Sequence, residues 1–144
     1  MIKIEINNSK KYSVNNQLIL NTVKFAEKLE KTINGIVEIN LVNNQEIKQI
    51  NKLWRQKNSI TDVLSFAWRE EKKLKSDYLG QIFISYPRII KQAKEYKVNS
   101  EEEFVRMLAH GLLHLVGYDH KTTKDAKKMF FVQEKILSKQ FKKK

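Results

Sequence analysis

The chain has 144 residues, of which 41% are hydrophobic and 31% charged, and this size and composition predict one compact globular domain rather than two. Its 28 Lys and Arg residues outnumber 16 Asp and Glu residues, which gives a net charge of +12. This charge favours polyanionic partners such as nucleic acid. The alternative is that the lysine excess reflects the coding bias of an AT-rich genome. The absence of Cys excludes disulfides and thiolate chemistry, so that His, Asp or Glu must bind any metal. No apolar run approaches the roughly 18 residues of a membrane helix and no secretory segment opens the chain, so we expect a soluble, cytoplasmic protein without membrane contact.

The first half of the chain alternates strand and helix patterns. Apolar residues alternate over residues 2–6, which predicts a strand, and recur at helical spacing over residues 18–29. Residues 36–42 have the composition of a second strand. Asn43 and Glu46 then form the pattern of a helix N-cap with a reciprocal partner, which predicts a second helix.

Two β-prone runs follow, residues 61–66 and 79–85, and the charged stretch 69–77 between them predicts an exposed connection and antiparallel pairing. Pro87 fits the first turn of a helix that extends toward residue 98.

The most apolar helix is expected over residues 104–116, after a capping-box pattern formed by Ser100 and Glu103. Gly117 predicts its end, and Thr122 or Thr123 with Asp125 predicts the start of a last helix. The predicted order is β-α-β-α-β-β-α-α-α. It corresponds to a mixed α+β fold in one domain over residues 1–144, with a small mixed sheet of about four strands, about five helices, and a solvated basic tail at residues 142–144.

All three His residues of the chain fall within one segment of eleven residues, HGLLHLVGYDH. His110 and His114 are one helical turn apart and therefore share a face. Gly117 permits a reversal of the backbone that can bring His120 back toward the same point. Three imidazoles suit Zn²⁺ and leave its fourth tetrahedral position open, as in catalytic zinc sites, whereas the alternative is a set of core His residues bonded to carbonyl groups.

The spacing of these His residues equals that of the metzincin proteases, in which a Glu after the first His is the general base. Here that position is Gly111, which cannot accept a proton, so a protease-like hydrolase is only a minor alternative.

The segment HGLLHLVGYDH resembles the characteristic motif of the YbeY family, bacterial endoribonucleases that mature ribosomal RNA. The stretches 51–55, 61–66 and 79–85 resemble other segments of the family in the same order, so that the similarity extends over most of the chain. The resemblance implies one zinc ion per chain on His110, His114 and His120. It also implies a role in activity for Arg55, for which the alternative is a solvated charge at the end of the second predicted helix.

The sequence departs from the family pattern at two positions. Gln81 stands where the family usually has Asp, and Ala67 stands where Pro commonly follows the preceding Phe. If the family's Asp orients a metal ligand or a water, Gln81 is expected to weaken metal binding or slow the reaction.

Several basic residues lie near Arg55 in the chain, in or beside expected loops, and are candidates for contacts with an RNA backbone: Lys57, Arg69, Lys72, Lys73 and Lys75. Five Trp and Tyr residues are candidates for stacking on unpaired bases, although core packing is the more common use of such side chains: Trp54, Trp68, Tyr78, Tyr86 and Tyr118.

These expectations describe a zinc-dependent hydrolase of single-stranded RNA. By resemblance, it would act in 16S rRNA 3′-end maturation and ribosome quality control, with the small ribosomal subunit or ribosome-associated proteins as partners. The attacking group is either a water molecule or the 2′-OH of the substrate. The alternative is a ribosome-assembly factor that binds RNA without cutting it and holds a structural zinc, with Asp62, Asp119 or Glu134 as the fourth ligand.

Overall fold

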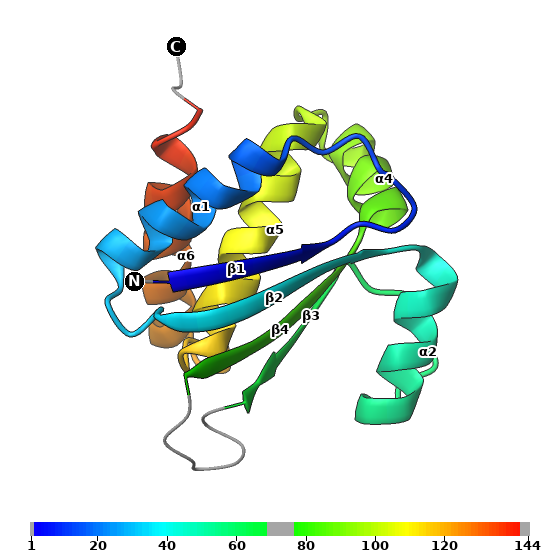
Figure 1. Cartoon of the computed structure of the whole chain (residues 1–144), viewed down its shortest axis with the longest axis horizontal. Helices are drawn as coiled ribbons and strands as arrows, with labels where there is room; N and C mark the ends of the chain where they lie inside the picture. The colour runs from blue at the N-terminus through cyan, green and yellow to red at the C-terminus, as the bar shows by residue number, and fades with distance from the viewer. Residues whose placement is uncertain (1, 69–76, 142–144) are drawn as a thin grey trace.

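The computed structural model describes residues 2–68 and 77–141, which form a four-stranded mixed sheet and five helices (Figure 1). Along the sheet the strands are ordered β1-β2-β4-β3; β2 is parallel to both of its neighbours, and β3 is antiparallel to β4. The predicted order of elements and the α+β fold class are therefore confirmed. The elements are β1 (Ile2–Asn7), α1 (Asn16–Leu29), β2 (Gly35–Val42), α2 (Asn44–Arg55), β3 (Val63–Ala67), β4 (Tyr78–Ser85), α4 (Tyr86–Tyr96), α5 (Ser100–Leu115) and α6 (Thr123–Ser138).

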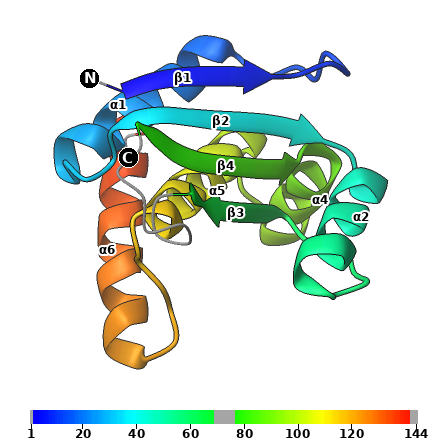
Figure 2. The same ribbon diagram turned by 60° about the horizontal axis from the view of Figure 1, so that its bottom comes forward.

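Helix α5 is the centre of the fold. It packs against β3 and β4 on one side and contacts α1, α4 and α6, as Figures 1 and 2 show. Its buried residues, among them Phe104, Leu108 and Leu112, join Ile82 and Ile84 of the sheet in the main hydrophobic core. This helix is rigidly held because so many elements pack on it, and it is therefore a firm support for the two His residues that it carries.

The predicted capping box at the start of α5 is wrong. Asn99 is the N-cap, and its side chain accepts hydrogen bonds from the backbone amides of Glu101 and Glu102. Ser100 is the first helical residue, and Glu103 is buried with its carboxylate paired to Arg106. Asn and Ser are both good caps, and here the Asn99 side chain is the one that accepts from the amides of the first turn.

Helix α2 packs against the face of the sheet opposite to α5. Because side chains alternate along a strand, Leu64 and Phe83 point away from α5, and they form a second hydrophobic cluster with Ile47 and Ile50 of α2. The predicted capping box of this helix is confirmed, since Asn43 and Glu46 exchange side-chain hydrogen bonds with each other's backbone amides. The last turn of α2 lies beside the edge strand β3, since Arg55 donates a hydrogen bond to the Ser65 carbonyl.

Among the described helices, none combines the length and the apolar character needed to cross a bilayer.

Candidate metal centre

The three His residues converge on one point. One ring nitrogen of each of His110, His114 and His120 lies within 4.8 Å of the other two. The Nε2 atoms of His110 and His114 are 3.0 Å apart, so that both nitrogens border the same space. Three imidazoles arranged in this way fit a borderline metal ion such as zinc, for which imidazole nitrogen is a common ligand.

The turn that returns His120 to the helix is built by Gly117. Gly117 has φ +94°, in the left-handed region, and its amide donates to the carbonyl of His114 while the amide of Tyr118 donates to that of Leu113. This pair of bonds is a Schellman motif, for which glycine is the favoured residue. The Tyr118 hydroxyl donates to the Glu30 carboxylate over 2.7 Å, which ties the reversed loop to the end of α1.

Burial keeps the two helical imidazoles neutral. Desolvation, followed by the neighbouring His110, lowers the pKa of His114 to about 4. Desolvation also lowers the pKa of His110, and the hydrogen bond to Gln133 opposes that shift. Since a metal binds only neutral imidazole, both residues have their ligand form at neutral pH before any metal arrives.

The triad opens into a cavity of about 670 Å³ between α2, the edge strand β3 and the loop after α5. Arg55 and Lys57 line this cavity together with the three His residues. These two groups of candidates lie more than fifty positions apart in the sequence, and the fold brings them together. The basic residues and the imidazoles therefore border a single hollow.

Arg55 is held in a defined orientation although it is exposed. Its Nη2 donates to the backbone carbonyl of Ser65 over 3.1 Å, and its guanidinium carbon lies 5.7 Å from the centre of the Phe66 ring. A guanidinium that is fixed by one bond and one aromatic face keeps its remaining N–H groups available for a phosphate.

Two carboxylates line the cavity beside the triad, Asp62 and Asp119. Asp62 accepts hydrogen bonds from the backbone amide of Val63 and from Gln92, over 2.8 and 3.2 Å. Asp119 accepts from the amide of Lys121 over 3.1 Å. Among the described residues, the group of ligand atoms that lie together contains only the three imidazoles, and neither carboxylate belongs to it.

Gly111 faces the sheet and not the cavity. A Cβ at this position would lie 3.1 Å from Ser65 Oγ and 3.1 Å from Ile82 Cγ2, and the Ser65 hydroxyl donates to the Gly111 carbonyl. The position has no room for the Glu of a protease, which argues against that alternative.

The two departures from the family pattern lie in different places. Gln81 donates to Glu38 and points away from α5, so it is not part of the cavity lining. Ala67, the other departure from the family pattern, does line the cavity. Four of the basic candidates lie outside the described residues: Arg69, Lys72, Lys73 and Lys75.

The aromatic candidates divide between packing and exposure. Tyr86 stacks on Tyr12 with ring centres 4.9 Å apart, and Tyr118 is bonded to Glu30. Trp54 is 67% exposed at the end of α2.

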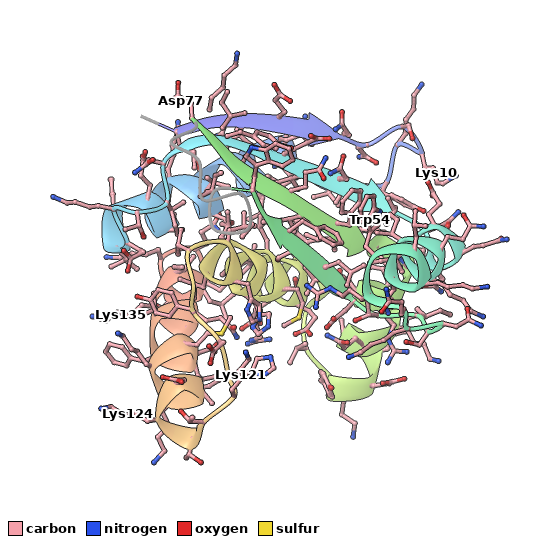
Figure 3. The ribbon with its side chains drawn as sticks, turned by 90° about the horizontal axis from the view of Figure 1, so that it is seen from below. Lys10, Trp54, Asp77, Lys121, Lys124 and Lys135 are labelled. Atoms are coloured by element: carbon pink, nitrogen blue, oxygen red, sulfur yellow. The ribbon has the colours of Figure 1, made fainter. Side chains whose placement is uncertain are left out.

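Sequence reasoning missed two residues of the site. Lys121 lines the cavity from the loop that joins α5 to α6, where Figure 3 labels it. Gln133 of α6 is in contact with His110, as their 2.9 Å separation shows. Lys121 follows His120 directly and could have been found by its position, whereas nothing in the sequence points to Gln133.

Comparison with known proteins agrees with this geometry. The family model "Endoribonuclease YbeY" matches residues 2–140. An Endoribonuclease YbeY from Malacoplasma penetrans (strain HF-2) is 39% identical over 95% of this chain and 93% of its own length. Another, from Sulfurihydrogenibium sp. (strain YO3AOP1), is 46% identical over 76% of this chain and 74% of its own.

The fold is also similar to a solved structure, the solution structure of TM1509 from Thermotoga maritima. The TM-score is 0.63 at 30% sequence identity, and the match covers 96% of this chain and 87% of that one. The match of the family model to nearly all of the chain, together with these relatives, confirms the resemblance inferred from the HGLLHLVGYDH segment. The chain belongs to the YbeY endoribonuclease family.

Proposed function

We propose that this protein is a zinc-dependent endoribonuclease that cuts single-stranded RNA during maturation of the 16S rRNA 3′ end. The observation that carries the proposal is the shared cavity, in which Arg55 and the triad of His residues face the same space. The family resemblance supports the ribosomal target and a role in ribosome quality control, at the small ribosomal subunit or its associated proteins.

His110, His114 and His120 would hold one zinc ion per chain. When bound, the ion would lower the pKa of a water molecule and polarise a phosphoryl oxygen, and three protein ligands leave it a position for this purpose. A set of three imidazole ligands fits an open, catalytic site better than a structural one, which normally has four protein ligands.

Arg55 would bind the phosphate at the scissile bond. Its bond to Ser65 and its contact with Phe66 fix the guanidinium before substrate enters, so that little reorganisation accompanies the build-up of charge on phosphorus. Lys57 and Lys121, on the rim, would contact the flanking phosphates.

The geometry of the cavity favours an unpaired substrate. A hollow of about 670 Å³ beside basic side chains can take a nucleotide that is not stacked in a helix, and unpaired nucleotides are the usual targets of RNA recognition. Attack by a water molecule would leave a 5′-phosphate, and attack by the 2′-OH would leave a cyclic phosphate. The product ends, read by mass spectrometry, therefore distinguish the two routes.

The proposal is tested by incubating zinc-loaded protein with a labelled single-stranded RNA that contains the 3′ region of 16S rRNA precursor, and with the same RNA annealed to its complement. We expect cleavage of the single strand and little cleavage of the duplex. A His114→Ala variant should bind the RNA without cutting it. Tight RNA binding by fully loaded wild-type protein without cleavage of any RNA would instead identify a non-catalytic assembly factor.

A further inference from the structure

A chain of polar side chains lies behind the cavity, between α5, α6 and α4. It begins at His110, whose Nδ1 lies 2.9 Å from Oε1 of Gln133 on α6. Gln133 is only 6% exposed and is therefore removed from solvent that could replace this contact. A buried polar side chain is costly unless its hydrogen bonds are satisfied, so its partners are informative.

The orientation of the Gln133 amide follows from its second partner. Its Nε2 donates to the carboxylate of Glu134 over 3.4 Å, and a carboxylate cannot donate in return. The amide oxygen is then directed at His110, where it accepts a hydrogen bond from Nδ1–H. His110 is thereby fixed as the tautomer that carries its proton on Nδ1 and presents the Nε2 lone pair to the space shared by the three imidazoles.

Glu134 is itself held in place. Arg106 of α5 bonds both to Glu134, from Nε over 3.3 Å, and to Glu103, from Nη1 over 2.7 Å. Glu103 is 1% exposed and accepts a hydrogen bond of 2.5 Å from Gln92 of α4.

Gln92 closes the chain, since its Nε2 also lies 3.2 Å from Asp62, which lines the cavity. The two ends of the chain, His110 and Asp62, therefore both line the cavity. Gln133 contacts His110 and Glu134, and Arg106 in turn fixes Glu134, so that Gln133 is a rigid partner for the imidazole.

We propose that Gln133 is a positioning residue of the metal centre, which fixes the tautomer and ring orientation of His110 so that its Nε2 is ready for the metal. The inference rests on the proposed function of the triad as metal ligands, and it adds a residue from α6 that no metal-ligand pattern contains. Outer partners of this kind change metal affinity by about 10- to 100-fold when they are removed.

The test compares three variants with wild type. Gln133→Met keeps the length of the side chain but removes the acceptor, and Gln133→Glu keeps an acceptor oxygen. The matched control is Gln140→Met. Gln140 follows α6 and donates from Nε2 to Thr22 Oγ1 of α1 over 2.6 Å, but it does not line the cavity. Zn²⁺ affinity is measured by competition with a chelator, and the imidazole ¹⁵N shifts of metal-free protein report the tautomer of His110.

We expect about 10- to 100-fold weaker Zn²⁺ binding by Gln133→Met, recovery by Gln133→Glu and no change in Gln140→Met. In the metal-free protein, His110 should carry its proton on Nδ1 in wild type and lose this preference in Gln133→Met. Wild-type affinity and tautomer in a folded Gln133→Met protein would overturn the inference, and so would equal weakening by Gln133→Met and Gln140→Met. A wild-type protein that binds no zinc would contradict the proposed function, while the tautomer of His110 would still decide the role of Gln133.

Discussion

Arg55 donates a hydrogen bond from Nη2 to the backbone carbonyl of Ser65, 3.1 Å away, and this bond joins the last residue of α2 to the middle of the edge strand β3. Ser65 in turn donates from its hydroxyl to the carbonyl of Gly111, one residue after the first His. The guanidinium and the triad are therefore connected through a single strand residue. The relative placement of the two halves of the site depends on the packing of β3 against α5.

Replacement of Arg55 by Lys should separate chemistry from binding. Lys keeps the charge but loses the planar fork, so RNA affinity should change little while the cleavage rate falls on the order of 10²-fold, as is typical when one transition-state donor is removed. Single-turnover cleavage and binding titrations measure the two quantities. Arg88→Lys on α4, away from the cavity lining, is the matched control. Equal cleavage rates in Arg55→Lys and Arg88→Lys would show that Arg55 is only a surface charge.

Replacement of Gly117 should affect the third ligand through the backbone. A non-glycine residue at φ +94° costs about 1–2 kcal/mol, and relaxation of the turn would move His120 away from the other two imidazoles. We expect Gly117→Ala to lower both thermal stability and Zn²⁺ affinity. Gly117→Asn should retain more of each, because Asn tolerates the left-handed region. If Ala and Asn behave alike and bind zinc as wild type does, the turn does not control His120.

The metal-free protein should lose stability in weak acid. The pKa of His114 is lowered from 6.5 to about 4 in the folded chain, so that between these values the unfolded chain binds more protons than the folded one. The free energy of unfolding should therefore fall as the pH is lowered from about 6.5 to about 4. Urea unfolding of metal-free protein at several pH values measures this slope, and His114→Gln should make it shallower. An identical slope in that variant would refute the assignment to His114.

The basic rim should contribute a salt-dependent share of RNA binding. Each phosphate contact that is lost should reduce the slope of log affinity against log salt by about 1. We expect this from Lys57→Ala and from Lys121→Ala, both at the cavity, but not from Lys24→Ala on the exposed side of α1. A salt response that is flat, or that Lys24 changes equally, would indicate that the +12 charge reflects composition rather than a binding surface.

The sequence predicts those parts of this molecule that are set by local spacing. His110 and His114 are four residues apart, and helix geometry alone places their side chains on one face. Gly117, three residues later, ends the helix through its left-handed backbone. Arg55 was identified by resemblance, because its contact with Ser65 depends on how α2 and β3 pack. Gln133 could not be predicted either, because its contact with His110 depends on how α6 packs against α5.

The error at the start of α5 has a related cause. Asn99 and Ser100 are adjacent residues with similar capping ability, and the buried contact of Glu103 with Gln92 of α4 is a tertiary contact that a capping pattern cannot reveal. The Glu103 carboxylate is instead bonded to Gln92 and Arg106.

The most direct test of the account is a zinc titration of metal-free protein with single-stranded RNA cleavage as the readout. Activity should rise linearly and reach a plateau at about one equivalent of Zn²⁺ per chain, because one triad holds one ion. A folded His110→Ala, His114→Ala double variant should stay inactive throughout the same titration. Full cleavage by metal-free wild-type protein, or the same plateau in the double variant, would contradict the assignment of the reaction to these His residues.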